Sequence, residues 1–345
     1  SVSMGGHRTM RAMPATLPDG RRLGAHLPLA TGMVRAVERA RTIRARALQI
    51  WTDNPTAWRR RAAPPAEAPA FRARLRALDI GPVAVHASYL INLAGPEPAF
   101  FERSIDLLAA ELRDGPTFGA RFVNVHIGSH RGAGVTPGTE RLADGVARTL
   151  AAVAEDSGGG DPHATVPTRL PMLVLENSAG SGFGLGTDLD ELAAIARAID
   201  ARGVPDDRVG FCLDTAHAWG AGLDVADPAA IDAFLSGFDA RIGLHRLVMV
   251  HLNDSRSARG SRLDRHEHLG AGRIGAAGLA RILTHPALAH VTYYLETPGM
   301  DEGYDAVNLA RARDIAAGRL LERLPPEALE VRSSRGRSAP AEDIG

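Results

Sequence analysis

Short apolar runs alternate with amphipathic stretches along most of the chain. Eight runs rich in β-branched and other apolar residues cover 22–27, 47–52, 83–88, 122–127, 172–177, 209–215, 246–253 and 291–297. Apolar positions at helical spacing lie between them, as over 33–43, 100–115, 141–156, 189–200 and 304–318. The alternation predicts eight βα units, which close into a (β/α)₈ TIM barrel. An open doubly wound sheet is the alternative, but no glycine-rich dinucleotide turn follows the first run.

The barrel is predicted to form one domain over residues 22–320. Residues 1–21 lack the apolar middle segment of a secretory signal, so we expect a disordered lead-in. Residues 321–345 are charged and contain proline, which predicts a disordered tail. Residues 156–171 are rich in glycine and proline and lie between the fourth helix and the fifth strand. That position places them at the N-terminal face of the barrel, away from an active site.

Composition narrows the class of protein. The 345 residues carry a net charge of zero, so no global field points to a nucleic-acid partner, although a local arginine stripe can still bind one. All 40 basic residues are arginine. The only cysteine, Cys212, excludes an intrachain disulfide and a thiolate metal site, and it suits the reducing cytoplasm. No run of about 18 apolar residues predicts a membrane span.

Titratable side chains stand where the predicted strands end. The third to eighth strands deliver His86, His126, Glu176, Asp214, His251 and Glu296, while His217, Asp264 and His266 follow in the adjoining loops. In a TIM barrel the C-terminal ends of the strands form the active-site rim. Any one of these residues could be a satisfied polar core residue or, for Asp214, a helix cap. Six consecutive strands ending in this way indicate a shared site.

Divalent cations would explain the carboxylates at this rim. Four carboxylates packed together without counter-ions would repel one another and become protonated, and the chain has no lysine to neutralise them. Nitrogen and oxygen ligands without sulfur suit Zn²⁺, with Mn²⁺ or Fe²⁺ as alternatives. Nine ligands are too many for one ion and enough for two or three.

Several blocks resemble those of the endonuclease IV family, the apurinic/apyrimidinic (AP) endonucleases of family 2, also called deoxyribonuclease IV. They read "HASYLINLAG", "LENSAG", "CLDTAHAWGAG", "HLNDSRSARGSRLDRHEHLGAGRIG" and "LETPG". The resemblance extends from about residue 23 to residue 315, and all nine metal-binding positions of the family have a matching residue in order.

The resemblance implies three zinc ions. His86, His126 and Glu176 would hold the first. Glu176 would bridge to the second, which Asp214, His251 and Glu296 complete, and His217, Asp264 and His266 would hold the third. Glu176, Asp214 and Glu296 are then the expected catalytic carboxylates.

The resemblance also implies a function in base excision repair. The chain would be a zinc-dependent hydrolase that cleaves duplex DNA 5′ of an abasic site, leaving a 3′ hydroxyl and a 5′ deoxyribose phosphate. We expect a cytoplasmic monomer. DNA contacts are expected from Tyr89 and Leu90, which match positions that enter the duplex, and from arginines. The arginines are Arg59 to Arg61, near the second strand, and Arg256, Arg259, Arg262 and Arg265, in the loop after the seventh strand.

Two other functions stay open from the sequence. A metal-dependent sugar isomerase or epimerase of the xylose isomerase-like barrels shares the fold, but it would leave His217, Asp264 and His266 unexplained. A non-catalytic DNA-damage binding protein is the second, although the full ligand set argues against lost chemistry. Thr56 and Pro28 replace an arginine and a serine common in the family, which bears on lesion recognition.

Overall fold

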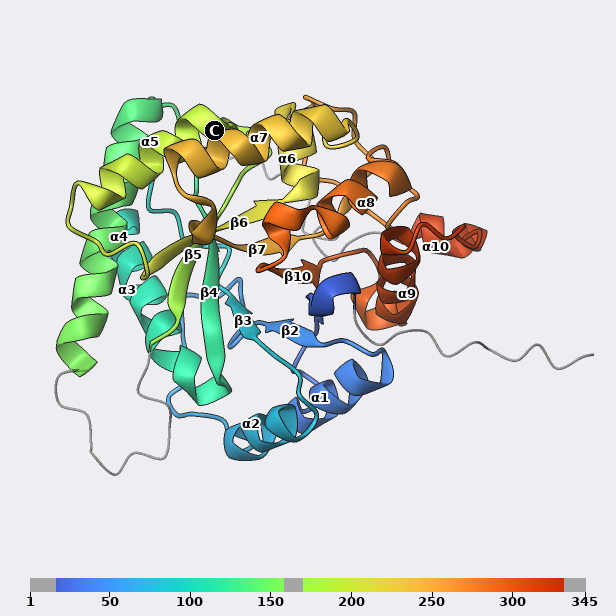
Figure 1. Ribbon diagram of the computed structural model, residues 1–345. Coiled ribbons are helices and arrows are strands. Elements are labelled where there is room, and N and C mark those ends of the chain that lie inside the picture. The colour runs from blue at the N-terminus through green and yellow to red at the C-terminus, as the bar shows by residue number, and fades with distance from the viewer. Residues whose placement is uncertain (1–16, 158–169, 332–345) are drawn as a thin grey trace, which may run out of the picture.

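The computed structural model describes residues 17–157 and 170–331, and it forms a closed barrel of eight parallel strands (Figure 1). The strand order around the barrel is β1-β10-β7-β6-β5-β4-β3-β2. These strands are β1 (Arg22–His26), β2 (Ala47–Ile50), β3 (Val83–His86), β4 (Ala120–His126), β5 (Met172–Glu176), β6 (Val209–Asp214), β7 (Leu247–His251) and β10 (Thr292–Leu295). All eight predicted strands are therefore confirmed, and so is the TIM-barrel fold.

Helices surround the barrel and bury their apolar faces against it. They are α1 (Met33–Thr42), α2 (Ala68–Ala77), α3 (Pro98–Asp114), α4 (Val135–Ser157), α5 (Leu189–Asp200), α6 (Thr215–Ala221), α7 (Pro228–Arg241), α8 (Gly275–Thr284), α9 (Tyr304–Ala316) and α10 (Pro326–Glu330). Local signals set their ends: at α5 the Asp188 side chain caps the helix by accepting from the backbone N–H of Glu191. Within the described residues, no helix has the length and apolar content needed to cross a membrane.

A separate apolar layer fills the inside of the barrel. Seven of the eight strands contribute one inward-facing side chain to it, namely Ala47, Ala84, Phe122, Val174, Cys212, Met249 and Tyr294. The large side chains of Phe122 and Tyr294 fill the space that the small residues Ala47 and Ala84, on the neighbouring strands β2 and β3, leave in the barrel interior. The layer closes the barrel beneath the C-terminal rim, and the side chains at the rim pack directly on it.

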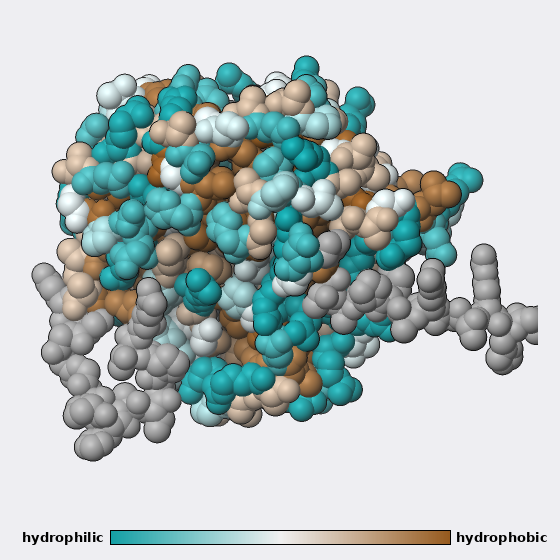
Figure 2. All heavy atoms as spheres, viewed as in Figure 1, coloured by the Kyte–Doolittle hydropathy of each residue, from teal (hydrophilic) through white to brown (hydrophobic). Residues whose placement is uncertain are grey.

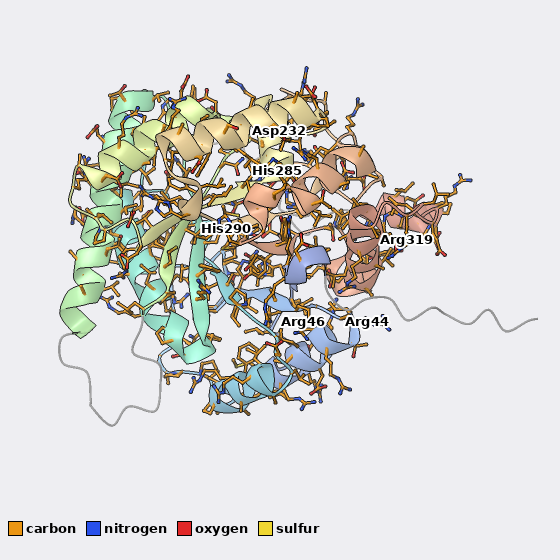
Figure 3. The ribbon with its side chains drawn as sticks, viewed as in Figure 1. Arg44, Arg46, Asp232, His285, His290 and Arg319 are labelled. Carbon is orange, nitrogen blue, oxygen red and sulfur yellow. The ribbon has the colours of Figure 1, made fainter. Side chains whose placement is uncertain are left out.

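The opposite end of the barrel is polar and charged. In Figure 3, Arg46 and His290 lie beside the starts of β2 and β10, so the view is onto the N-terminal ends of the strands. Hydrophilic side chains cover much of this face in Figure 2. Asp79 forms ion pairs with Arg22 and Arg46 at this end, so these two arginines stabilise the fold.

The structure differs from the sequence prediction at the inner ends of both terminal extensions. Leu17 and Arg21 are buried, and Arg21 donates to the backbone oxygen of Leu283 at 2.6 Å. At the other end α10 packs on the barrel, where Ala328 is buried and its carbonyl accepts from His268 at 2.9 Å. Residues 1–16 and 332–345, and 158–169 of the predicted insertion, lie outside the described residues. The insertion joins the end of α4 to the start of β5, as predicted.

Candidate metal centre

The site stands directly on the apolar layer. Because successive side chains of a strand point to opposite faces, a residue two positions beyond each layer residue also points inward. Those residues are Gln49, His86, Asn124, Glu176, Asp214, His251 and Glu296. All seven are polar and buried. Residues two positions apart on each strand therefore form two adjacent layers inside the barrel. The lower layer is apolar, and the upper one holds the candidate metal ligands.

The first group consists of His86, His126 and Glu176. The Nε2 atoms of His86 and His126 lie 3.7 Å and 3.6 Å from Oε2 of Glu176. Register explains part of this proximity, since His126 and Glu176 are directly paired on β4 and β5. The three ligand atoms lie within 4.8 Å of one another, close enough to share one ion. These are the residues predicted for the first zinc.

The second group shares Glu176 with the first. Nδ1 of His251 lies 3.2 Å from Oε1 of Glu176, 3.6 Å from Oε2 of Glu296 and 3.9 Å from Oδ2 of Asp214. Asp214 and His251 are register partners on β6 and β7. The structure thus brings together all four residues predicted for the second ion, and the two oxygens of Glu176 face different groups.

The third group comes from helix α6 and from the loop after β7. His217, in α6, places Nε2 at 3.3 Å from Oδ2 of Asp264, and His266 places Nε2 at 3.1 Å from Oδ1 of the same carboxylate. Oδ2 of Asp214 is also close, 3.5 Å from Nε2 of His266. Asp214 therefore borders both the second and the third group, a sharing that the sequence prediction did not include.

The ring orientations test whether these residues suit a metal. Nδ1 of His86, His217 and His266 donates to a backbone carbonyl, that of Ala87 (2.8 Å), Asn177 (2.9 Å) and Glu296 (2.8 Å) respectively. Each Nε2 is then left with its lone pair towards the carboxylates. A metal-ligating histidine needs this second hydrogen bond to fix its tautomer and orientation. Nitrogen and oxygen donors arranged in this way fit zinc or a similar divalent cation.

His251 is oriented the other way round. Its Nε2 donates to Oε1 of Gln49 at 2.9 Å, so that Nδ1 faces the centre. The amide of Gln49 in turn donates to Oε1 of Glu296 at 2.7 Å and lies 3.2 Å from Nδ1 of the buried His26. One amide therefore fixes a histidine and a carboxylate of the second group together.

Other amides hold the remaining carboxylates, and the sequence prediction missed them. Asn124 donates to Oε2 of Glu176 at 2.6 Å, and Asn253 donates to Oδ2 of Asp214 at 2.8 Å. Gln49 and Asn124 could have been found by counting two positions beyond the inward-facing apolar residues Ala47 and Phe122. Asn253, in the loop after β7, has no such signal.

The charges within the centre compensate one another in the metal-free chain. Burial raises the pKa of Glu176, but His251 and His126 lower it further, to well below its ordinary value. Burial lowers the pKa of His217, yet the carboxylates of Asp214 and Asp264 raise it well above its usual range. In the metal-free chain, protonated histidines therefore neutralise the carboxylates, as bound cations would do in the loaded protein.

The loop that carries Asp264 and His266 is organised by Asp254. This buried carboxylate accepts backbone N–H groups from Gly270 (2.9 Å), Gly272 (3.1 Å) and Ile274 (3.0 Å). A short antiparallel pair, β8 (Asp254–Ser255) with β9 (His266–Glu267), closes the base of the loop. Asp254 was not among the predicted site residues, because nothing in the sequence distinguishes it from a solvated loop carboxylate.

The residues predicted to contact DNA divide into two kinds. The Tyr89 ring lies 5.4 Å and 5.9 Å from the rings of His86 and His126, beside the centre, and Leu90 is half-buried against the core. Arg59, Arg262 and Arg265 are exposed. The other predicted arginines form hydrogen bonds or ion pairs with residues of the protein.

These engaged arginines have defined partners. Arg256 donates to the carbonyl of His266 and pairs with Glu267 at 3.5 Å, so it braces the loop. Arg60 pairs with Glu111 at 2.8 Å, Arg61 with Asp114 at 2.9 Å, and Arg259 with Asp224. These four side chains therefore contact other residues of the protein, and their contact with DNA stays a prediction.

A cavity of about 630 Å³ opens beside the centre. His126, His217 and Asp264 line it together with Tyr89. Its other lining residues come from the loops after β3, β4 and β5. The volume lies within the range of small-ligand pockets.

Comparison with known proteins finds relatives that match most of the barrel. A family model described as "Xylose isomerase-like TIM barrel" matches residues 37–320. The chain is 40% identical over 294 residues to the "probable endonuclease 4" of Methanoculleus marisnigri, covering 85% of this chain and 98% of the relative. Endonuclease IV from Thermus thermophilus superimposes with a TM-score of 0.71 at 38% identity, covering 86% of this chain and 99% of that one. A D-tagatose 3-epimerase-like protein, 16% identical with a TM-score of 0.56, shares the fold (86% and 96% covered).

Proposed function

Because the chain belongs to the endonuclease IV family of xylose isomerase-like TIM barrels, we propose that it is an AP endonuclease acting in base excision repair. It hydrolyses the phosphodiester 5′ of an abasic site in duplex DNA and leaves a 3′ hydroxyl and a 5′ deoxyribose phosphate. One observation carries the proposal: three ligand groups meet at one rim and are joined by shared carboxylates, Glu176 and Asp214.

The nine predicted ligands are proposed to hold three zinc ions, in the groups described above. Divalent cations at such a site supply Lewis-acid chemistry, which ionises a water near neutral pH and neutralises charge on a phosphodiester. The chain's own residues provide the geometry. Glu176 keeps two groups together, Asp214 lies between the second and the third, and Glu296 completes the second. The buried amides of Gln49, Asn124 and Asn253 hold these carboxylates in place before substrate arrives.

Recognition of DNA is proposed to use the residues around the cavity mouth. Tyr89 stands beside the first group and is positioned to enter the gap left by the missing base, with Leu90 behind it. The exposed Arg59, Arg262 and Arg265 supply phosphate contacts, which position the duplex without reading its sequence. Arg256 contributes indirectly, through the loop that it braces. We propose that the enzyme works as a monomer in the cytoplasm.

A sugar isomerase or epimerase is the competing function, since such enzymes share this fold. The third group favours the endonuclease, because His217, Asp264 and His266 form a further site whose carboxylate bridges two imidazoles at 3.3 Å and 3.1 Å. A third cation at this group suits a phosphodiester, whose negative charge and departing oxygen it would neutralise, better than an uncharged pair of sugar hydroxyls.

Incision of a synthetic duplex tests the proposal. The zinc-loaded protein should cut a labelled duplex at a single abasic site and leave a 3′ end that a DNA polymerase extends directly. The matched duplex without the abasic site should stay intact. Isomerisation of a free ketose together with no incision would select the competing function.

A further inference from the structure

One aromatic side chain stands apart from the others. Among the phenylalanines that the structure describes, only Phe183 is exposed, with 61% of its surface accessible. It lies in the loop after β5, seven residues beyond the shared ligand Glu176, and it lines the same cavity as His126, His217 and Asp264. An apolar ring exposed at the mouth of a polar site needs an explanation other than core packing.

The loop holds this ring outward at a conformational cost. Phe183 has φ = +63°, in the left-handed region that a bulky residue rarely adopts. Gly180 and Gly182, which precede it in the loop, also have positive φ values, which glycine tolerates. A non-glycine residue kept in such a conformation at a ligand site indicates a function for that residue.

The loop is also fixed from the side. The carbonyl of Phe183 accepts from the N–H of His130 at 3.1 Å, and Ser129 forms a β-bridge with Gly184. The His130 ring lies 5.3 Å from the Phe183 ring. Phe183 is therefore presented by a braced turn, so a planar partner can stack on it without first ordering the loop.

The rest of the cavity defines the partner. Arg131 and Phe183 both line it, together with the candidate metal ligands His126, His217 and Asp264, and Gly182 leaves open space beside the ring. A cation for phosphate, an aromatic face and a volume of about 630 Å³ suit one nucleotide. We propose that Phe183 stacks on the nucleobase next to the abasic site on the incised strand, while Arg131 faces the phosphate of that nucleotide.

This inference rests on the proposed endonuclease function and adds a residue that recognises the flanking nucleotide. It makes a specific claim: the contribution of Phe183 depends on a base being present beside the lesion. A structural role for Phe183 would not depend on the DNA.

Three duplexes separate these possibilities. The first has one abasic site, and the others also lack the base on its 5′ side or on its 3′ side, with product length identifying the incised bond. On the first duplex, Phe183→Ala should raise KM about five- to 150-fold, the size of a base–aromatic stack, with zinc content unchanged. On one of the other two, wild type and Phe183→Ala should have the same KM.

Matched variants complete the test. Phe183→Tyr keeps the ring and should restore the wild-type KM, whereas Phe183→Leu should not. Leu320→Ala removes another exposed apolar side chain, remote from the cavity lining, and should change nothing. If wild type incises but Phe183→Ala raises KM equally on all three duplexes, or on none, the stacking role is overturned and the endonuclease function stands. If wild type does not incise the first duplex, both proposals fail.

Discussion

The proposed metal centre is built from two halves that are held in different ways. Strand-borne ligands such as Glu176, Asp214 and His251 are fixed by sheet register, as the direct pairing of Asp214 with His251 shows. Loop-borne ligands, Asp264 and His266, lie in a segment between β7 and α8 that has only a two-residue antiparallel pair of its own. Strand pairing in the barrel therefore fixes the positions of the first half, whereas contacts within the loop must fix those of the second.

In the second half a buried carboxylate, that of Asp254, fixes the backbone in place of strand pairing. Asp254 gathers backbone N–H groups from the far side of the loop and so fixes the path of the chain through Asp264 and His266. Strand-borne ligands need only single amides to set their side-chain orientation. We infer that a positioning residue matters more where the backbone is less constrained.

The largest effect is expected from the residue that the strand-borne groups share. Glu176→Ala removes both oxygens that face the first and second groups, and it takes a buried carboxylate away from His86, His126 and His251. Incision should become undetectable, and at least one equivalent of zinc should be lost in metal analysis of the purified protein. Near-normal activity and full zinc content would mean that Glu176 has only a structural role and does not bind metal.

Disturbing the loop-borne half should have the next largest effect. In Asp254→Asn one oxygen becomes an NH₂ group, which cannot accept the N–H groups of Gly270 and Gly272. One equivalent of zinc should bind about 100-fold more weakly while two are retained, because a lost outer contact costs about 10- to 100-fold. A chelator titration measures this. Asp227→Asn, at the N-cap of α7, is the matched control and should keep all three.

Disturbing the outer contacts of the strand-borne half should cost less. Gln49→Met keeps the volume but removes the donor to Glu296 and the acceptor for His251. Because register still places both ligands, we expect about a tenfold weaker affinity for one equivalent, at the low end of the range for such contacts. If this variant lost as much affinity as Asp254→Asn, register would not be the stabilising factor that we infer.

The smallest effect concerns the pH dependence of the metal-free protein. Raised pKa values at His217 and His251 give stability that is fully present below about pH 6.5 and declines as pH rises through the folded-state values. Lowered pKa values at Glu176 and Asp264 give stability that is present above about pH 4.3 and is lost as pH falls. Both halves thus predict maximal stability between about pH 4.3 and 6.5.

Thermal melts of chelator-treated protein should therefore shift downwards by a few degrees as pH rises above that window. Zinc-loaded protein should show the opposite trend above about pH 6, since metal binding requires the histidines to be deprotonated. Parallel pH profiles with and without zinc would contradict the charge compensation described for the centre.

The strand ends were predictable because two physical rules operate on short stretches. Buried parallel strands are read directly from apolar runs, and the rim lies where those runs stop. The amides at Gln49 and Asn124 obey the same period but were missed, since an uncharged polar residue within a strand does not suggest chemistry. The engagement of Arg60, Arg61 and Arg256 could not be predicted, because it depends on loop conformations and on partners distant in sequence. The same holds for the burial of Leu17 and Ala328.

The central claim is that linked metal groups at this rim carry out phosphodiester hydrolysis. Its most direct test is to add zinc back to the metal-free protein in steps and to measure, in the same samples, bound zinc and the rate of incision of an abasic duplex. The account predicts that incision 5′ of the abasic site appears only as the second and third equivalents bind. Full activity with one equivalent, or incision by the zinc-free protein at the loaded rate, would contradict it.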